Sequence, residues 1–226
     1  MNFQIQNIAP RDAYKLLTGV VVPRPIALVT SRNTDGMLNA APFSYFNLVG
    51  SKPPLVVLGL AAKAPGSPKD TARNIQEAGE FVVNMVSREL MDAMNICAID
   101  FPPDISEIEA ARLEIAASQV IKTPRLAATP AALECRHHTS LLIGENRVIL
   151  GEVVAIYIRD EAVDAEKFHV DGGQLDLIGR MGGGGGYTDT SGTFELARMS
   201  LDEWQAQNAD SQNADSQNAD SQNGRL

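Results

Sequence analysis

The chain of 226 residues has few cysteines, an excess of acidic over basic side chains and no long apolar segment. Its two cysteines, Cys97 and Cys135, are typical of reduced thiols in a cytosolic protein, and one disulfide in a secreted protein is the alternative. No apolar run approaches the roughly 20 residues that span a bilayer, and the first four residues lack the features of a signal peptide. The net charge of −9 disfavours nucleic acid and anionic membranes as partners. We therefore expect a cytoplasmic protein that binds neither.

Motifs for hydrolysis, phosphoryl transfer and metal binding are also missing. The sequence has no G-x-S-x-G elbow and no P-loop, so it contains no recognisable motif for acyl or phosphoryl transfer. His137 and His138 are adjacent, and adjacent side chains of a strand point to opposite faces, so they cannot chelate one metal ion there. No H-x-H, HExxH or CxxC spacing occurs elsewhere. We expect no metal site, and a partly buried His137 on the same face as Leu133 and Cys135.

The C-terminal end is a short direct repeat. The pentapeptide QNADS occupies residues 207–211, 212–216 and 217–221, and none of its side chains is both apolar and larger than alanine. Such a segment cannot offset the entropy of ordering it, so we predict a disordered tail over residues 205–226. Trp204 is the last residue suited to core packing, which places the folded body at residues 1–204.

The body combines numerous short β-branched segments with few helical patterns. Gly144-Glu145 joins two long segments that we expect to pair antiparallel, and Pro42 indicates a sheet edge or a bulge. This pattern favours a β-barrel over the alternating strands and helices of a Rossmann fold. The glycine run 182–186 follows no predicted strand, so we interpret it as a flexible loop rather than a dinucleotide fingerprint. Strands are predicted at residues 25–31, 38–48, 55–60, 81–86, 131–143 and 146–160, and helices at 69–79 and 88–98.

The segment Ser67-Pro68-Lys69-Asp70-Thr71 has the features of a helix start. Ser67 is a candidate N-cap, Pro68 suits the first helical position, and Asp70 completes a capping box. The first turn of a helix exposes free backbone N–H groups and about half a positive charge. With Lys69 and Thr71 beside them, these groups suit a phosphate. The alternative is a well-capped helix without a ligand.

Two other segments place polar groups where a ligand can reach them. Arg24 lies between two prolines that fix the backbone, so its guanidinium suits a phosphate, a ring carbonyl or, alternatively, a surface carboxylate. In the segment 39–47, small residues let a planar ligand approach the backbone, and Ser44 and Asn47 offer hydrogen bonds to a polar ring edge. An ordinary strand with a bulge explains this second segment as well.

In their order along the chain, these segments resemble the flavin reductase-like family, whose members bind FMN in a split β-barrel. The resemblance covers roughly residues 10–198 and is strongest to the branch that includes the flavoredoxins. It is carried by PRPIALVTS at 23–31, DGMLNAAPFSYFN at 35–47, KPPLVVLGL at 52–60, KDTARNI at 69–75, GEFVVNMVS at 79–87, ALEC at 132–135, VILGEVV at 148–154 and GRMGG at 179–183 with Tyr187.

The resemblance implies a mainly β fold with a few short helices: a six-stranded Greek-key split barrel that binds FMN near the interface of a homodimer. No catalytic residue is implied. The implied cofactor-binding residues are Thr30, Ser31 and Arg32 along the ring or the ribityl chain, Ala41, Pro42, Phe43, Ser44 and Asn47 at the ring, Lys69 and Thr71 at the phosphate with Asp70 securing that turn, and also Arg24 and Tyr187.

The implied function is a flavin oxidoreductase that transfers a hydride or electrons between NAD(P)H and FMN, the phosphate site favouring FMN over FAD. Because the cofactor carries the chemistry, no protein acid or base is required. Better-known reductases of the family position the nicotinamide with a histidine near the late hairpin, which here reads Gly144-Glu145-Asn146. The alternative is therefore an FMN-containing electron carrier that a protein partner reduces without NAD(P)H. An electron-transfer or monooxygenase partner is expected, and a barrel used only as a binding module is a third hypothesis.

Overall fold

The computed structural model describes residues 1–63, 66–102 and 104–206. The chain divides into two compact units, residues 1–191 and a second unit that begins at Gly192. In the second unit, residues 201–206 are helical. The QNADS repeats lie outside the described residues, so the disordered tail and its boundary after residue 204 stay predictions. No helix in the described ranges is long and apolar enough to cross a membrane.

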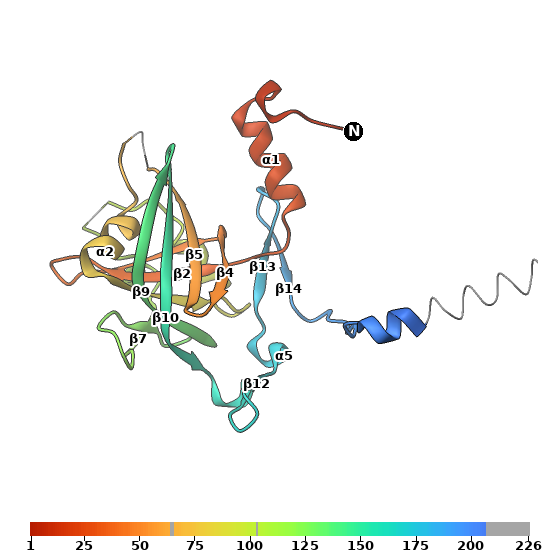
Figure 1. The fold of residues 1–226 in the computed structure, drawn as a ribbon. Coiled ribbons are helices and arrows are strands. Elements are labelled where there is room, and N and C mark those ends of the chain that lie inside the picture. Colours follow the sequence, from red (N-terminus) through yellow and green to blue (C-terminus); the bar gives the residue numbers. More distant parts are fainter. Residues whose placement is uncertain (64–65, 103, 207–226) are drawn as a thin grey trace, which may run out of the picture. The chain divides into compact units, whose positions relative to one another are not determined.

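A seven-stranded sheet forms the centre of the first unit (Figure 1). Its strands follow the order β3-β2-β6-β9-β10-β5-β4, and every neighbouring pair is antiparallel. The mainly β prediction is therefore confirmed. Among the described residues the sheet does not close into a barrel, and β3 and β4 are its edges. The strands are β2 Ala27–Arg32, β3 Leu38–Phe43, β4 Phe46–Ser51, β5 Pro54–Ala61, β6 Glu80–Met85, β9 Ala131–Ile143 and β10 Asn146–Ile158.

The predicted strand over residues 38–48 is in fact two strands. Pro42 lies inside β3, opposite Leu28 of β2, and the chain breaks at Ser44-Tyr45 instead. An edge strand tolerates proline because one of its sides needs no hydrogen-bond donor, so the edge prediction for Pro42 is confirmed. The count of six strands was wrong because this one segment supplies both edges of a seven-stranded sheet.

A smaller sheet of β1 (Arg24–Pro25), β13 (Ile178–Met181) and β14 (Gly186–Asp189) lies beside helix α1 (Pro10–Val20) (Figure 1). The glycine run forms the hairpin turn between β13 and β14, and Gly182 and Gly185 have positive φ of 56° and 93°. The glycine run is thus a loop and not a dinucleotide fingerprint, as interpreted, but it does follow a strand, because β13 is too short to leave a clear sequence pattern. The other elements are η1 Ile5–Asn7, α2 Asp70–Ala78, α3 Met91–Ile96, α4 Glu107–Ala110, β7 Ile115–Ala116, β8 Arg125–Leu126, η2 Asp160–Ala162, β11 Val163–Asp164, β12 His169–Val170 and α5 Gly172–Leu175.

Both faces of strand β2 are buried, which explains the apolar residues in its first half. On one face Val29 packs in a cluster with Ile75 of α2 and Phe81 of β6. On the other face Leu28 packs with Met94 of α3 and its neighbours. Leu90, Met94 and Cys97 thus belong to the core, with Met91 packed against it. Cys97 and Cys135 are both buried and free, which confirms the expectation of unpaired thiols.

The segment after β7 is fixed to the sheet by a buried carboxylate. Glu134 of β9 is 3% exposed, and it accepts hydrogen bonds from the backbone amides of Gln119, Val120 and Ile121 at 2.7, 2.8 and 3.3 Å. We expect Glu134→Ala to lower the free energy of unfolding by about 3 kcal/mol, because several buried donors lose a charged acceptor. Urea denaturation measures this loss. The exposed Glu145→Ala is the control, with an expected change within about 0.5 kcal/mol, and an equally small change in Glu134→Ala would contradict the assignment.

Candidate functional site

Helix α2 begins later than the sequence predicted. Its N-cap is Lys69, in an extended conformation with φ −62° and ψ 151°, and no side chain caps the helix. The predicted cap at Ser67 and the capping box with Asp70 are therefore wrong. The backbone of Ser67 closes a turn instead, because its carbonyl accepts a hydrogen bond from the amide of Lys63 at 3.0 Å. No side chain therefore accepts a hydrogen bond from the backbone amides at the start of α2.

The uncapped turn keeps hydrogen-bond donors available. The carbonyl of Lys69 accepts hydrogen bonds from the amides of Ala72 and Arg73 at 3.0 and 3.2 Å. Within the described ranges, the amides of Asp70 and Thr71 have no acceptor and the ammonium group of Lys69 has no carboxylate partner. Free amides at a positive helix end, next to an unpaired ammonium group, form an arrangement that attracts an anion.

The helix start opens into a groove, here called the Lys69 groove, with a cavity of about 90 Å³. The groove brings together six of the predicted cofactor-binding residues: Ala41, Pro42 and Phe43 from β3, and Lys69, Asp70 and Thr71 from α2. Its other lining residues are Asn39, Lys63, Cys97, Ala98, Ile99, Asp100, Phe101 and Glu107.

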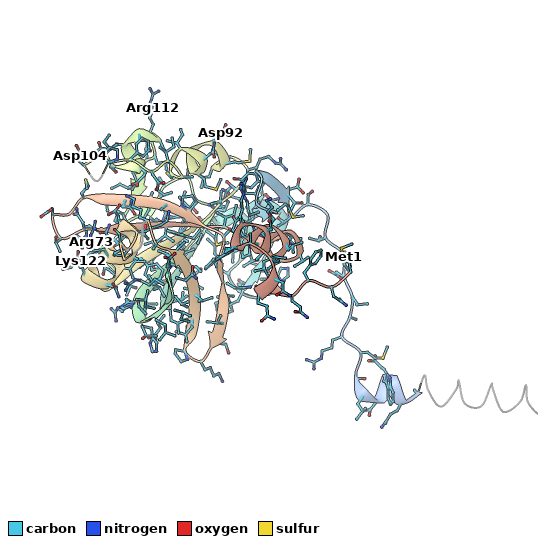
Figure 2. All side chains as sticks on the ribbon, turned by 90° about the horizontal axis from the view of Figure 1, so that it is seen from above. Met1, Arg73, Asp92, Asp104, Arg112 and Lys122 are labelled. Carbon is cyan, nitrogen blue, oxygen red and sulfur yellow. The ribbon has the colours of Figure 1, made fainter. Side chains whose placement is uncertain are left out.

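Asp70 forms ion pairs with two basic side chains at the start of α2. Its carboxylate accepts a hydrogen bond from Lys63 Nζ at 2.9 Å and another from Arg73, which projects from α2 (Figure 2). Burial alone would raise the pKa of Asp70, but the hydrogen bonds and charges of Lys63 and Arg73 outweigh it and hold the pKa below its usual range. Asp70 therefore stays ionised, and it keeps both cations beside the free amides.

Thr71 is part of a polar network that the sequence did not predict. It is 2% exposed, and its hydroxyl donates to Asn39 Oδ1 at 2.9 Å. Asn39 Nδ2 in turn donates to Glu107 Oε1 at 2.8 Å, and the amide of Ala40 donates to Glu107 Oε2 at 3.2 Å. Burial raises the pKa of Glu107 above its usual range. Glu107 lies in a region where the sequence analysis predicts no helix or strand, and no local signal singled it out.

Three predicted residues on β2 do not line the groove. Thr30 is fully buried, and its hydroxyl donates to the carbonyl of Pro124 at 2.7 Å. Ser31 is also fully buried, and its hydroxyl donates to Asn39 Oδ1 at 3.4 Å, so it supports the groove from behind. Arg32 lies 3.8 Å from the carboxylate of Glu80. The Thr30 contact anchors the loop at Pro124, and the other two contacts join β2 to β3 and to β6.

Arg24, Ser44 and Asn47 line a different, mainly apolar cavity of about 480 Å³ between α1, β4 and β5, here called the α1–β4 cavity. Arg24 is 5% exposed and donates to the carbonyls of Thr18, Val21 and Gly182, each at 2.8 Å, and to Ser44 Oγ at 3.4 Å. The alternative of a surface carboxylate partner is therefore wrong. Arg24 joins α1 to the β13–β14 hairpin.

Two further predictions fall outside both cavities. Tyr187 of β14 packs beside the cluster that contains Leu28, under the guanidinium of Arg180 at 4.7 Å from the ring centroid. His137 is partly buried, as predicted, and its Nε2 lies 2.8 Å from Ser140 Oγ. Burial lowers the pKa of His137. The described part of the chain contains no group of three or more His, Cys, Asp or Glu side chains arranged to hold a metal ion.

Comparison with known proteins identifies the family. Residues 19–175 match the family of the flavin reductase like domain. The chain belongs to this family. The resemblance drawn from the sequence, and with it the split-barrel class of fold, is thereby confirmed. An uncharacterized protein of Deinococcus radiodurans is 47% identical over 211 residues, which cover 91% of this chain and 93% of that protein.

Two solved structures are similar to the chain over almost their whole length. One is the 2-nitrobenzoate 2-nitroreductase NbaA of Pseudomonas fluorescens, with 37% identity, a TM-score of 0.82, and coverage of 89% of this chain and 98% of that one. The other is component B of the nitrilotriacetate monooxygenase of Bacillus cereus, with 35% identity, a TM-score of 0.82, and coverage of 87% and 98%. Such neighbours support an oxidoreductase.

Proposed function

We propose that this flavin reductase-like protein binds FMN through the start of α2 and transfers reducing equivalents between NAD(P)H and flavin. The observation that carries the proposal is the set of free donors there: the amides of Asp70 and Thr71 and the ammonium of Lys69, all at one groove. Family membership supplies the expectation of a flavin.

The chemistry of the donors fits the terminal phosphate of FMN. A phosphate monoester carries nearly two negative charges at neutral pH. The helix start offers Lys69 directly, and Lys63 and Arg73 both bond to Asp70, so two cations offset this carboxylate beside the phosphate. A diphosphate such as that of FAD presents less charge per phosphate to the same donors. We therefore propose FMN as the preferred cofactor, held at its phosphate by Lys69 and the two amides.

The ring is proposed to lie along Ala41, Pro42 and Phe43 of β3. Ligand sites usually enclose about 300–1,000 Å³, so the 90 Å³ groove of a single chain covers only part of a flavin. The neighbouring α1–β4 cavity is lined by exposed apolar residues, among them Leu17, Val21 and Tyr45. A second copy of the chain that covers this surface would complete the enclosure, which supports a homodimer. Light scattering coupled to gel filtration tests it: a mass near that of one chain contradicts the homodimer.

When bound, FMN supplies an acceptor for a hydride or for single electrons. The residues of this chain bind and orient it, and none of them has to act as an acid or a base in the transfer. The experiment is to purify the protein, record flavin absorbance, and follow oxidation of NADH and of NADPH with added FMN. A protein that takes up no FMN at micromolar concentration would falsify the proposal.

An FMN-containing electron carrier is the second candidate, and the β9–β10 hairpin favours it. The hairpin turn at Gly144-Glu145 offers no histidine to position a nicotinamide. The similarity to a monooxygenase component supports an oxygenase as the partner. Stopped-flow mixing with NADH and with NADPH decides between the two functions. A carrier keeps its flavin oxidised until a reductase is added, whereas rapid bleaching by either nucleotide excludes it.

A further inference from the structure

Glu107 lies at the Lys69 groove, and the proposed function does not use it. It is the first residue of α4, and both of its carboxylate oxygens are engaged by β3, one by Asn39 Nδ2 at 2.8 Å and one by the amide of Ala40 at 3.2 Å. Asn39 Oδ1 accepts from the Thr71 hydroxyl at 2.9 Å. A chain of hydrogen bonds therefore connects the first turn of α2 to Glu107, and every donor in it points toward the carboxylate.

The direction of this chain depends on the protonation of Glu107. An ionised carboxylate only accepts hydrogen bonds, so Asn39 must turn its NH₂ group to Glu107 and its carbonyl to Thr71. The Thr71 hydroxyl then donates its one proton to Asn39 and presents only lone pairs to the groove. A protonated Glu107 donates instead. The Asn39 amide then turns over, its NH₂ group donates to Thr71 Oγ1, and the Thr71 proton becomes free to bond an anion.

We propose that Glu107 is a positioning residue whose protonation reverses this chain and thereby couples FMN binding to the uptake of one proton from solvent. The inference rests on the proposed FMN site. It assigns to Glu107 no contact with the cofactor, since Glu107 acts through Asn39 and Thr71.

The charges around Glu107 make it the group that takes up the proton. Burial raises its pKa and the Asp70 carboxylate raises it further, against the opposing hydrogen bonds from Ala40 and Asn39. Asp70 stays ionised because Lys63 and Arg73 hold its pKa down. Burial raises the pKa of the Cys97 thiol to about 12, so it stays neutral. The charged groups that line the two cavities on either side of Glu107 are Lys63, Lys69, Arg73, Asp35, Asp70, Asp100 and Asp104.

The effect of a bound phosphate on the pKa of Glu107 sets the sign of the pH dependence of FMN binding. A phosphate at the helix start disfavours a nearby carboxylate, so the pKa of Glu107 is higher in the complex than in the free protein. FMN affinity then rises as pH falls through the pKa of the complex, and it levels off below the pKa of the free protein. Burial already raises the pKa of Glu107 in the free protein. The pH range over which FMN affinity changes therefore lies above the ordinary pKa of a glutamate. Each unit by which binding shifts this pKa changes the affinity about tenfold.

The test is the FMN dissociation constant of the full chain, from quenching of flavin fluorescence, between about pH 5 and pH 8. Wild type is compared with Glu107→Gln and with the matched control Glu109→Gln, an exposed glutamate of the same helix. The FMN phosphate itself also titrates, and it contributes equally to the pH dependence of the dissociation constant in all three proteins. We expect wild type and Glu109→Gln to gain affinity toward low pH relative to Glu107→Gln. The same slope in all three overturns the inference, whereas no FMN binding by wild type overturns the proposed function as well.

A second variant covers the case in which Glu107→Gln does not fold. Asn39→Ala keeps the Glu107 carboxylate but interrupts the path to Thr71, so its pH slope is expected to be smaller than that of wild type. Calorimetric titrations of wild type and Asn39→Ala in buffers of different ionisation enthalpy count the protons directly. Extra proton uptake by wild type supports the inference, and equal uptake by the two proteins overturns it.

Discussion

Replacing Lys69 with alanine is expected to weaken FMN binding about ten- to a hundredfold, because a charge-assisted hydrogen bond contributes about 1.5–3 kcal/mol. Lys69 is the N-cap of α2, its ammonium has no carboxylate partner among the described residues, and it faces the groove that also holds the free amides of Asp70 and Thr71. Riboflavin, which lacks the phosphate, should bind both proteins equally well. Fluorescence titration with each ligand measures the difference.

The matched control for Lys69 is Lys52→Ala. Lys52 is an exposed lysine next to the β4–β5 turn and lines none of the cavities described above. Its removal should leave both dissociation constants unchanged, apart from a small effect of net charge. If Lys69→Ala and Lys52→Ala bind FMN alike, the phosphate does not lie at the start of α2. A barrel used only as a binding module, or a phosphate site elsewhere in the chain, then becomes the better interpretation.

Arg24→Ala is expected to lower the free energy of unfolding by about 4 kcal/mol, because a buried guanidinium that serves three backbone carbonyls is lost. Those carbonyls belong to Thr18, Val21 and Gly182, so the variant should also loosen α1 from the β13–β14 hairpin. Urea denaturation gives the free energy, and hydrogen exchange of the α1 amides locates the loosened segment.

Two variants sharpen the Arg24 experiment. Arg24→Lys keeps the charge but cannot reach three carbonyls from one ammonium group, so an intermediate loss is expected. Arg11→Ala removes an exposed arginine from helix α1 and should change stability by less than about 0.5 kcal/mol. Should Arg24→Ala unfold like wild type while FMN affinity falls, Arg24 binds the cofactor rather than holding α1.

Local patterns predicted much of the fold because they act within a few residues. The β9–β10 hairpin follows from the length and adjacency of two segments joined by Gly144-Glu145, and the structure pairs them antiparallel. Helix α2 was predicted at residues 69–79 and occupies Asp70–Ala78, where Gly79 adopts the left-handed conformation at φ 71° and ends it. In both cases the signal and the structure lie in the same short segment.

Predictions failed where a distant or competing contact decides the structure. Ser67 has the right side chain for an N-cap, but its backbone closes a turn with Lys63 and the helix starts at Asp70. The acceptors of Arg24 lie as far as 158 residues away in sequence, so no local pattern identifies them.

The candidate site was predicted in part for the same reason. The motif that includes Lys69, Asp70 and Thr71 does meet Ala41, Pro42 and Phe43 at one groove. Glu107 was missed because its importance comes from Asn39, 68 residues earlier, and no local pattern connects the two. Thr30 and Arg32 match the family motif, but their side chains bond elsewhere in this chain.

The central claim is that the uncapped start of α2 binds the phosphate of FMN, and a crystal structure of the chain with FMN tests it most directly. The account predicts phosphate oxygens within about 3 Å of the backbone nitrogens of Asp70 and Thr71 and of Lys69 Nζ. A phosphate bound at any other place in the chain, with these donors still facing solvent, would contradict it.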